Sequence, residues 1–225
     1  MKGTLVNVAA IAGGSVIGMM LKSGIPERYQ KIVLQGLGLT TTIIGIQMSL
    51  KTQNILILIF SLVLGALVGE KVDIERRLKS FGERVTSRLG TKYGDAGEGF
   101  IAASLLYCVG AMAVVGSIQE GMTGDASILY AKSLLDGVSA VIFGSTLGIG
   151  VTLSSISILI YQGTITMLAA QASGIFSESV MREMTAVGGA LILAIGLMIL
   201  EVKRLNVANL LPAIPAAALI SLLWP

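Results

Sequence analysis

Two charged residues lie inside an apolar stretch of this sequence at a spacing that brings their side chains together. Lys132 and Asp136, in the segment KSLLDG, are four residues apart. In a helix they lie one turn apart on the same face and can form an ion pair. Unpaired, the carboxylate would cost roughly 2.5–3.5 kcal/mol within a membrane. An ionisable residue in such a position indicates a binding or transport site; the alternative is a structural ion pair closing one end of a bundle.

Three further polar side chains lie within or beside apolar stretches. Gln162 lies in the middle of one run and Asn7 in the first run of the chain. Such residues bind a ligand where a helix unwinds, or they hydrogen-bond neighbouring helices at about 0.6–2 kcal/mol each, and both interpretations stay open. Glu120, at the end of another run, belongs either to a binding site or to the headgroup region. The candidate residues for binding a solute or ion are thus Asp136, Lys132, Gln162, Glu120 and Asn7.

This sequence lacks the residues on which many classes of enzyme depend. It contains no histidine and one cysteine, Cys108. Without histidine there is no imidazole base, no His-ligated metal or haem, and no Ser–His pair to activate a nucleophile. We therefore expect no enzymatic activity, no cofactor and no metal centre.

The composition is typical of a membrane protein. Of the 225 residues, 54% are hydrophobic and 13% are charged, and the mean hydropathy is +0.85. A water-soluble domain of this length cannot bury so much apolar surface, whereas lipid solvates it. The 28 glycines suit close helix packing in a bilayer. The net charge of +3 does not indicate nucleic-acid binding, because the basic residues flank the apolar runs.

Eight apolar runs approach the ~20 residues that a helix needs to cross a bilayer. They lie roughly at 3–22, 30–50, 53–70, 99–119, 128–148, 150–175, 185–201 and 207–224. We expect an all-α, polytopic transmembrane bundle of about eight spans. Between 128 and 175 only Gly148 and Gly150 interrupt the run, so this region holds either two plain helices or a broken or re-entrant element. Residues 1–22 resemble a signal peptide but lack a convincing cleavage site, so we expect them to be retained.

Lysine and arginine are distributed unequally between the two sides of such a bundle. Twelve lie on one side and four, Lys2, Lys51, Lys132 and Arg182, on the other. Cytoplasmic loops carry the excess of positive charge. The first side is therefore predicted to face the cytoplasm, with both termini outside.

Two parts of the sequence resemble each other. GTLVNVAAIAGG (3–14) is similar to GTITMLAAQASG (163–174), and runs one to three match runs six to eight. An odd run paired with an even one crosses in the opposite direction, which predicts an inverted repeat around a midplane site. A chance likeness of Gly- and Ala-rich helices is the alternative. The predicted units are 1–70, a linker over 71–98, a central pair over 99–149 and the inverted unit 150–225. The other matched residues are Glu27, Lys31, Gly38, Ile44, Gly45 and Asn54 with Glu178, Arg182, Gly189, Ile195, Gly196 and Asn206.

One long polar stretch, 70–98, separates the third and fourth runs. Its apolar residues from Val72 to Leu89 follow a nearly helical spacing. This pattern predicts an amphipathic helix on the inner leaflet or on the protein itself, followed by a flexible glycine-rich return over 90–99. The segment serves either as a solvated connector or as a surface for a partner.

Several longer segments carry a resemblance to a known family. GTLVNVAAIAGG near the start, SLLYCVGAMAVVGSIQEG, KSLLDG and IYQGTIT, with the closing TAVGG and NLLP, form a distinctive combination. The chain resembles, over essentially its whole length, the bacterial inner-membrane proteins of domain-of-unknown-function family 554, the YdfK/YqgA-like proteins. The resemblance implies a polytopic protein of the bacterial cytoplasmic membrane, sometimes described as a transporter, and brings no catalytic residues with it.

Taken together, these features favour a small secondary transporter for an ion or small solute. An ion channel is the nearest variant, and a membrane scaffold or regulator acting through 70–98 is the alternative of another class. The expected partners are the lipid bilayer and the solute or ion, with no nucleic acid. GxxxG matches beginning at Gly14, Gly65 and Gly144 leave packing within the bundle and a homodimer both open.

Overall fold

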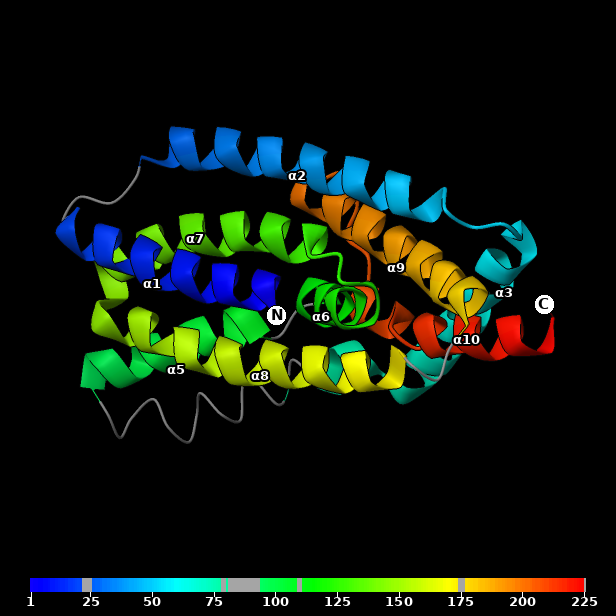
Figure 1. Ribbon diagram of the computed structural model, residues 1–225. Coiled ribbons are helices and arrows are strands. Elements are labelled where there is room, and N and C mark those ends of the chain that lie inside the picture. The colour runs from blue at the N-terminus through cyan, green and yellow to red at the C-terminus, as the bar shows by residue number, and fades with distance from the viewer. Residues whose placement is uncertain (22–25, 78–79, 81–93, 109–110, 174–176, 225) are drawn as a thin grey trace.

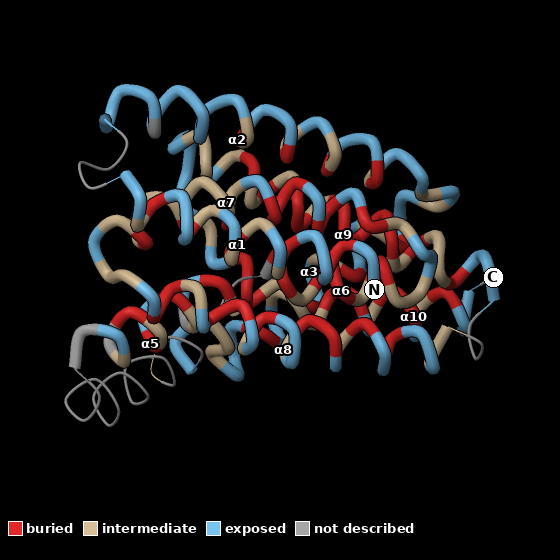
Figure 2. The backbone as a smooth tube through the Cα atoms, turned by 60° about the vertical axis from the view of Figure 1, so that its left-hand side comes forward, coloured by how far each residue is buried: buried red, intermediate tan, exposed pale blue. Residues whose placement is uncertain are grey.

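The computed structural model describes the chain except for residues 22–25, 78–79, 81–93, 109–110, 174–176 and 225. Every regular element in the described ranges is a helix. Most of the helices lie side by side, and their buried faces turn towards one another (Figures 1 and 2). In chain order they are α1 (Lys2–Met20), α2 (Glu27–Ser49), α3 (Ile55–Val72), α5 (Gly94–Cys108), α6 (Ala111–Thr123), α7 (Ser127–Leu147), α8 (Ile149–Ser173), α9 (Glu178–Ile199), the 3-10 helix η1 (Val207–Leu210) and α10 (Ala213–Leu223).

Six of the described helices, α1, α2, α3, α7, α8 and α9, are long and apolar enough to cross a bilayer. α5 and α6 are inclined to each other by 58° and form a seventh span if they are taken as one broken element. The stretch Val207–Leu223, which contains η1 and α10, is apolar but shorter. The protein is therefore an all-helical, multi-pass membrane protein. Its full-length spans in the described part number six or seven, rather than the eight that the sequence predicts.

The interruption predicted between 128 and 175 is a tight turn between two plain helices. α7 ends at Leu147 and α8 begins at Ile149, and Gly148 between them has a φ of 65°, which favours glycine. The bent element lies instead between α5 and α6, in the run predicted as one plain helix over 99–119.

Most of the predicted amphipathic segment, 70–98, lies outside the described residues. After α3 the chain turns at Asp73, whose φ is 55°, and residues 74–77 are again helical. α5 begins at Gly94, so the second half of the return predicted to be flexible is helical.

Three pairs of helices pack against each other in opposite directions: α1 with α8, α2 with α9, and α3 with η1 and α10. By contrast, α1 runs parallel to α7, and the α5–α6 pair runs parallel to α8. Each antiparallel pair joins a helix of the first 72 residues to one of the last 77. The contacts that fix the three antiparallel directions are Asn7–Gln162 with Ser15–Thr152, Gly38–Leu200 with Gly45–Leu193, and Gly65–Ala213 with Gly69–Asn209.

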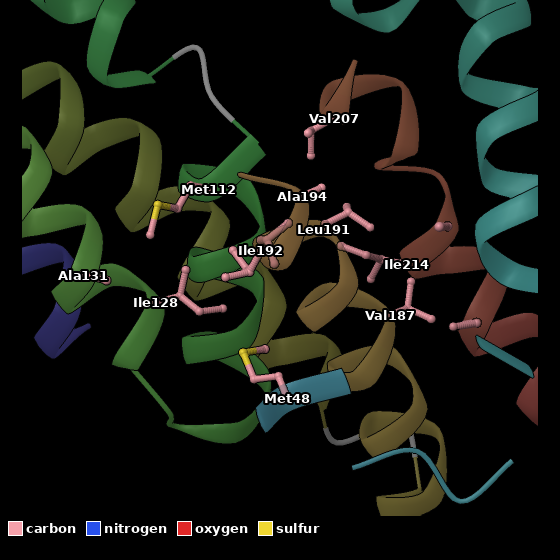
Figure 3. Packing of buried hydrophobic residues seen from close by; sticks show 13 residues of the cluster. Met48, Met112, Ile128, Ala131, Val187, Leu191, Ile192, Ala194, Val207 and Ile214 are labelled. Carbon is pink, nitrogen blue, oxygen red and sulfur yellow. The ribbon is translucent and has the colours of Figure 1, made fainter. Parts of the chain in front are cut away.

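The larger apolar cluster lies among α6, α7, α9 and the C-terminal segment. Leu191 and Ile192 of α9 are fully buried at its centre, and Met48 from the end of α2 packs against it (Figure 3). Lipid tails are as apolar as leucine, so close packing rather than removal from water stabilises such a cluster in a membrane. It holds α9 rigidly beside the helices that carry the polar residues described next.

Candidate functional site

The first half of α7 carries a buried ion pair. Lys132 Nζ lies 2.6 Å from Asp136 Oδ2, one helical turn away, and each residue is 6% exposed. In an apolar environment each charge depends on the other, because removing one leaves an uncompensated buried charge. The spacing of four residues predicts this pair, and the structure forms it.

Two amides from neighbouring helices complete the cluster around the ion pair. Asn7 of α1 donates through Nδ2 to Asp136 Oδ2 at 3.0 Å and to Gln162 Oε1 of α8 at 3.4 Å. Both amide side chains are fully buried. Four of the five candidate residues, from parts of the chain up to 155 residues apart, thus meet where α1, α7 and α8 come together. We refer to Asn7, Lys132, Asp136 and Gln162 as the Asp136 cluster.

Small residues let α1 and α7 approach closely enough for these bonds. A methyl group added at Gly14 would overlap the backbone carbonyl of Gly137, and one added at Gly144 would overlap the backbone of Ser15. Contact of backbone with backbone is the packing that small residues allow between membrane helices. It fixes the height of Asn7 relative to α7.

The fifth candidate residue, Glu120, lies against the start of α1. Its Oε1 accepts a hydrogen bond from the amide of Gly3 at 2.8 Å and lies 3.0 Å from the amino group of Met1. Glu120 is only 5% exposed. Its side chain is therefore enclosed by protein at the end of α6, beside the start of α1. It lies one turn of α1 away from Asn7, beside the Asp136 cluster.

A separate pocket of about 370 Å³ opens on the other side of α6. Gln119 and Thr185 are buried in its wall, where Thr185 Oγ1 donates to Gln119 Oε1 at 3.1 Å. Two cations and two carboxylates line it together, so its charges nearly balance. The charged residues that line the pocket are Lys51, Asp125, Glu178 and Arg182.

Asp125 in this pocket has a lowered pKa. Burial by itself raises it, but hydrogen bonds from the Ser127 hydroxyl and amide, together with the nearby charge of Lys51, lower it by more. The Ser127 hydroxyl lies 2.6 Å from Asp125 Oδ1 and the Ser127 amide 3.0 Å from it. The carboxylate is therefore ionised at neutral pH and holds the start of α7.

The chain matches one protein family, and two individual proteins, over nearly its whole length. The family model described as "Protein of unknown function (DUF554)" matches residues 2–222. The chain belongs to the DUF554 family. It is 35% identical over 227 residues to "Uncharacterized protein YqgA" of Escherichia coli, covering 99% of this chain and 97% of that protein. It is 31% identical over 220 residues to "Uncharacterized membrane protein YdfK" of Bacillus subtilis, covering 95% and 93%. No solved structure matches the chain significantly.

Further hydroxyl groups in this DUF554 protein are buried on the helices that carry or adjoin the candidate residues. The oxygens of Thr4 in α1, Tyr107 in α5, Ser117 in α6 and Thr166 in α8 have no hydrogen-bond partner among the described residues. Neither threonine is among the candidate residues selected from the sequence. Helical spacing was the available signal, because Thr4 precedes Asn7 by three residues and Thr166 follows Gln162 by four. No spacing connects Tyr107 or Ser117 to the cluster, since they come from other helices.

Proposed function

We propose that this protein is a small secondary transporter for an ion or small solute, not an enzyme, with its binding site at the Asp136 cluster. One observation carries the proposal: a buried ion pair is hydrogen-bonded across three helices, two of which cross in opposite directions. Charged residues within membrane helices are costly and mark solute and ion pathways by default. Secondary transporters bind their solutes between oppositely oriented halves of the chain.

Contacts between α2 and α9 support an inverted repeat. The matched residues of these helices differ by 151 positions, as Gly45 and Gly196 do. A two-fold axis between two such helices requires that each contact recur with the partners exchanged. Two contact pairs meet this requirement at the shift of 151. They are Gly45–Leu193 with Thr42–Gly196, and Gly38–Leu200 with Ser49–Gly189.

The same shift fits α1 and α8 better than the match that the sequence suggests first. Pairing Gly3 with Gly163 would set the first turn of α1 equivalent to the middle of α8. At a shift of 151, Asn7 corresponds to Ile158 and Gln162 corresponds to Ile11. The symmetric counterpart of the Asn7–Gln162 contact would therefore lie between Ile158 and Ile11. Those two isoleucines are fully buried in one apolar cluster. The polar contact and its apolar counterpart lie side by side near the proposed axis.

The positions of the basic residues support an orientation with both termini outside. The end of α9 lies beside the middle of α2, at Gly38, and because the two helices are antiparallel the start of α2 lies towards the same side of the bundle. The chain after α3 is hydrogen-bonded to η1. The basic residues near these adjoining helix ends are Arg28, Lys31, Lys71, Lys203 and Arg204. If the bent α5–α6 pair and the η1–α10 segment each cross the membrane, all of these residues face the cytoplasm.

In this proposal the Lys132–Asp136 ion pair is exchanged during binding. A cationic group or a proton that takes Asp136 Oδ2 releases Lys132 from it. Asn7 bonds both to Asp136 and to Gln162, so a change at the carboxylate on α7 alters the bonding between α1 and α8. The two halves of the chain meet along this contact, and their relative rocking would open the cluster to either side in turn.

The proposal is tested first by binding. The purified full chain in liposomes is screened for thermal stabilisation by ions and small metabolites, because a ligand of the folded state raises its apparent stability. We expect Asp136→Asn to lose the stabilisation by a ligand found in this way. Asp73→Asn, the same change in the turn after α3, should keep it. Equal stabilisation of Asp136→Asn and the wild type would remove Asp136 from the site.

Flux measurements then separate the remaining classes. Saturable uptake that follows a gradient identifies a transporter, whereas single-channel currents across a planar bilayer identify a channel. Function that survives Asp136→Asn but is lost when the basic residues of 71–92 are neutralised would favour the scaffold instead.

A further inference from the structure

The geometry points to a sodium site between α1, α6 and α8, one helical turn from the Asp136 cluster. We assign it to four buried oxygen atoms, which would bind one small monovalent cation. As the coupling ion of transport this cation rests on the proposed function, but its binding is measurable without transport. The four atoms are Thr4 Oγ1, Asn7 Oδ1, Glu120 Oε2 and Thr166 Oγ1.

These four oxygens need partners that the protein does not give them. Each belongs to a side chain that is at least nine-tenths buried, with exposures of 0% for Thr4 and Asn7, 2% for Thr166 and 5% for Glu120. None has a hydrogen-bond partner among the residues that the structure describes. A buried polar atom left without a partner costs about 1–3 kcal/mol, and a charged one costs more. Four of them in one region indicate a bound ligand.

Helical register brings two of the oxygens together. Thr4 lies one turn before Asn7 on α1, and Thr166 lies one turn after Gln162 on α8. The two helices are antiparallel and Asn7 is bonded to Gln162, so the turn that carries Thr4 lies beside the turn that carries Thr166. The side chain of Met1 lies close to Gly163, which confirms that the start of α1 follows this part of α8.

α6 brings the carboxylate to the same place. Glu120 Oε1 is bonded to the amide of Gly3, next to Thr4. The neighbouring Gly121 packs so closely on α8 that a methyl group there would overlap the carbonyl of Thr166. The start of α1, the end of α6 and the second half of α8 therefore converge, in agreement with their arrangement around the N-terminus in Figure 1.

The chemistry of the atoms selects a cation. Asn7 Nδ2 is used by Asp136 and Gln162, which leaves the acceptor Oδ1, and Glu120 Oε2 is an acceptor as well. An anion is excluded beside a carboxylate. Oxygen-only sites suit hard cations, and Ca²⁺ usually takes 6–8 oxygens with several carboxylates among them. One carboxylate with three neutral oxygens, and with the Met1 amino group already 3.0 Å from Glu120 Oε1, leaves room for at most one further positive charge.

The nearby cations do not occupy the assigned oxygens. Lys132 is neutralised by Asp136 at 2.6 Å, and the amino group of Met1 lies on Glu120 Oε1, not on Oε2. Asn7 belongs to both groups of atoms, offering Oδ1 to the ion and Nδ2 to Asp136. Sodium binding would hold the Asn7 amide in the orientation that supports the Asp136 cluster, which gives a direct route for coupling ion and solute.

The test compares sodium chloride with choline chloride at equal ionic strength. In the purified full chain, sodium should raise the melting temperature and radioactive sodium should bind saturably. Thr166→Val removes one ligand oxygen at constant shape and should raise the half-saturating sodium concentration about tenfold or more. Thr166→Ser keeps the oxygen and should bind nearly as the wild type does. Thr164→Val is the matched control, because this exposed threonine lies on the same helix.

The results separate this inference from the transporter proposal. Equal melting temperatures of the wild type in sodium and choline, or equal sodium affinities of Thr166→Val and Thr164→Val, would overturn the sodium site. Binding of a solute that depends on Asp136 could persist in either case, and the proposed function would stand. Sodium binding that requires Thr166, without gradient-driven flux of any solute, would support the site and contradict the transporter.

Discussion

Two crossings of antiparallel helices in this protein differ in the groups that make the contact. Where α2 crosses α9, glycines bring the backbones into contact: methyl groups added at Gly45 and Gly189 would overlap the opposite backbone. Where α1 crosses α8, the contact is made by the side chains of Asn7 and Gln162, both fully buried. Each crossing joins an early helix to a late one, and the second belongs to the site at which we propose that a solute binds.

This difference leads us to expect that the first crossing stabilises the fold and that the second binds a ligand. A crossing of backbone on backbone has one close-packed arrangement, so α2 and α9 are suited to keep the two halves of the chain in register. A crossing of polar side chains can exchange its hydrogen bonds for those of a ligand or water. It is stable only as long as each buried polar group finds a partner. We therefore expect mutations at the first crossing to affect folding and those at the second to affect binding.

The largest effect is expected at the glycine crossing. Gly45→Leu should prevent α2 from packing on α9, because the new side chain would meet the backbone of Leu193 and Gly189. Overpacking costs about 1–3 kcal/mol where side chains can shift, but here the added side chain meets backbone that can move only if the helices separate. The cost should therefore exceed about 4 kcal/mol. Little monodisperse protein should be recovered on size-exclusion chromatography. Gly36→Leu on the same helix, with open space around it, is the control and should be recovered normally.

A smaller loss is expected when the ion pair on α7, which is bonded to Asn7 of the α1–α8 crossing, is broken. Lys132→Met leaves the Asp136 carboxylate without its cation and should destabilise the fold by about 2.5–3.5 kcal/mol. The double variant Lys132→Met/Asp136→Leu removes both charges and should recover most of this loss. Thermal unfolding in detergent measures both effects. A double variant that is stable but binds no ligand would assign the pair to function; one that binds as the wild type does would assign it to structure alone.

The sequence predicts the members of the Asp136 cluster better than it predicts the geometry of the cluster. Lys132 and Asp136 are paired by local spacing, and the cost of charge in lipid marks them out. Asn7 and Gln162 stand out for the same reason, as amides inside apolar runs. Their contact with Asp136 depends on how α1 and α8 pack on α7, which no local pattern contains. Glu120 shows how far sequence position alone can be used. Its place at the end of an apolar run suggests an exposed side chain, whereas packing against the start of α1 buries it.

The spans were predicted with similar success and similar limits. Hydropathy identifies the long apolar helices because a long apolar run within lipid must form its backbone hydrogen bonds internally, and therefore folds as a helix. It does not distinguish a straight helix from the bent α5–α6 pair, since both are equally apolar. It leaves two plain helices and a broken element both open around Gly148, and the structure has two plain helices there. The match of 3–14 with 163–174 stays a prediction, because Gly- and Ala-rich segments match in several registers. In the proposed repeat, the contacts of α2 with α9 favour a shift of 151.

The smallest effect is expected at Asp125, a carboxylate outside both crossings. Its folded-state pKa lies below the ordinary value of 3.8, so ionisation favours the folded protein. This contribution is complete above that ordinary value and is lost as the pH falls through the lower folded-state pKa. The group is partly exposed, and screening keeps the contribution below about 1 kcal/mol. Asp125→Asn should therefore melt slightly below the wild type, by a difference that is constant from about pH 7 to 5 and shrinks only below about pH 4. A difference that already changes between pH 5 and 7 would show that Asp125 is coupled to the buried carboxylates, and that the polar region extends from the α1–α8 crossing into the pocket beyond α6.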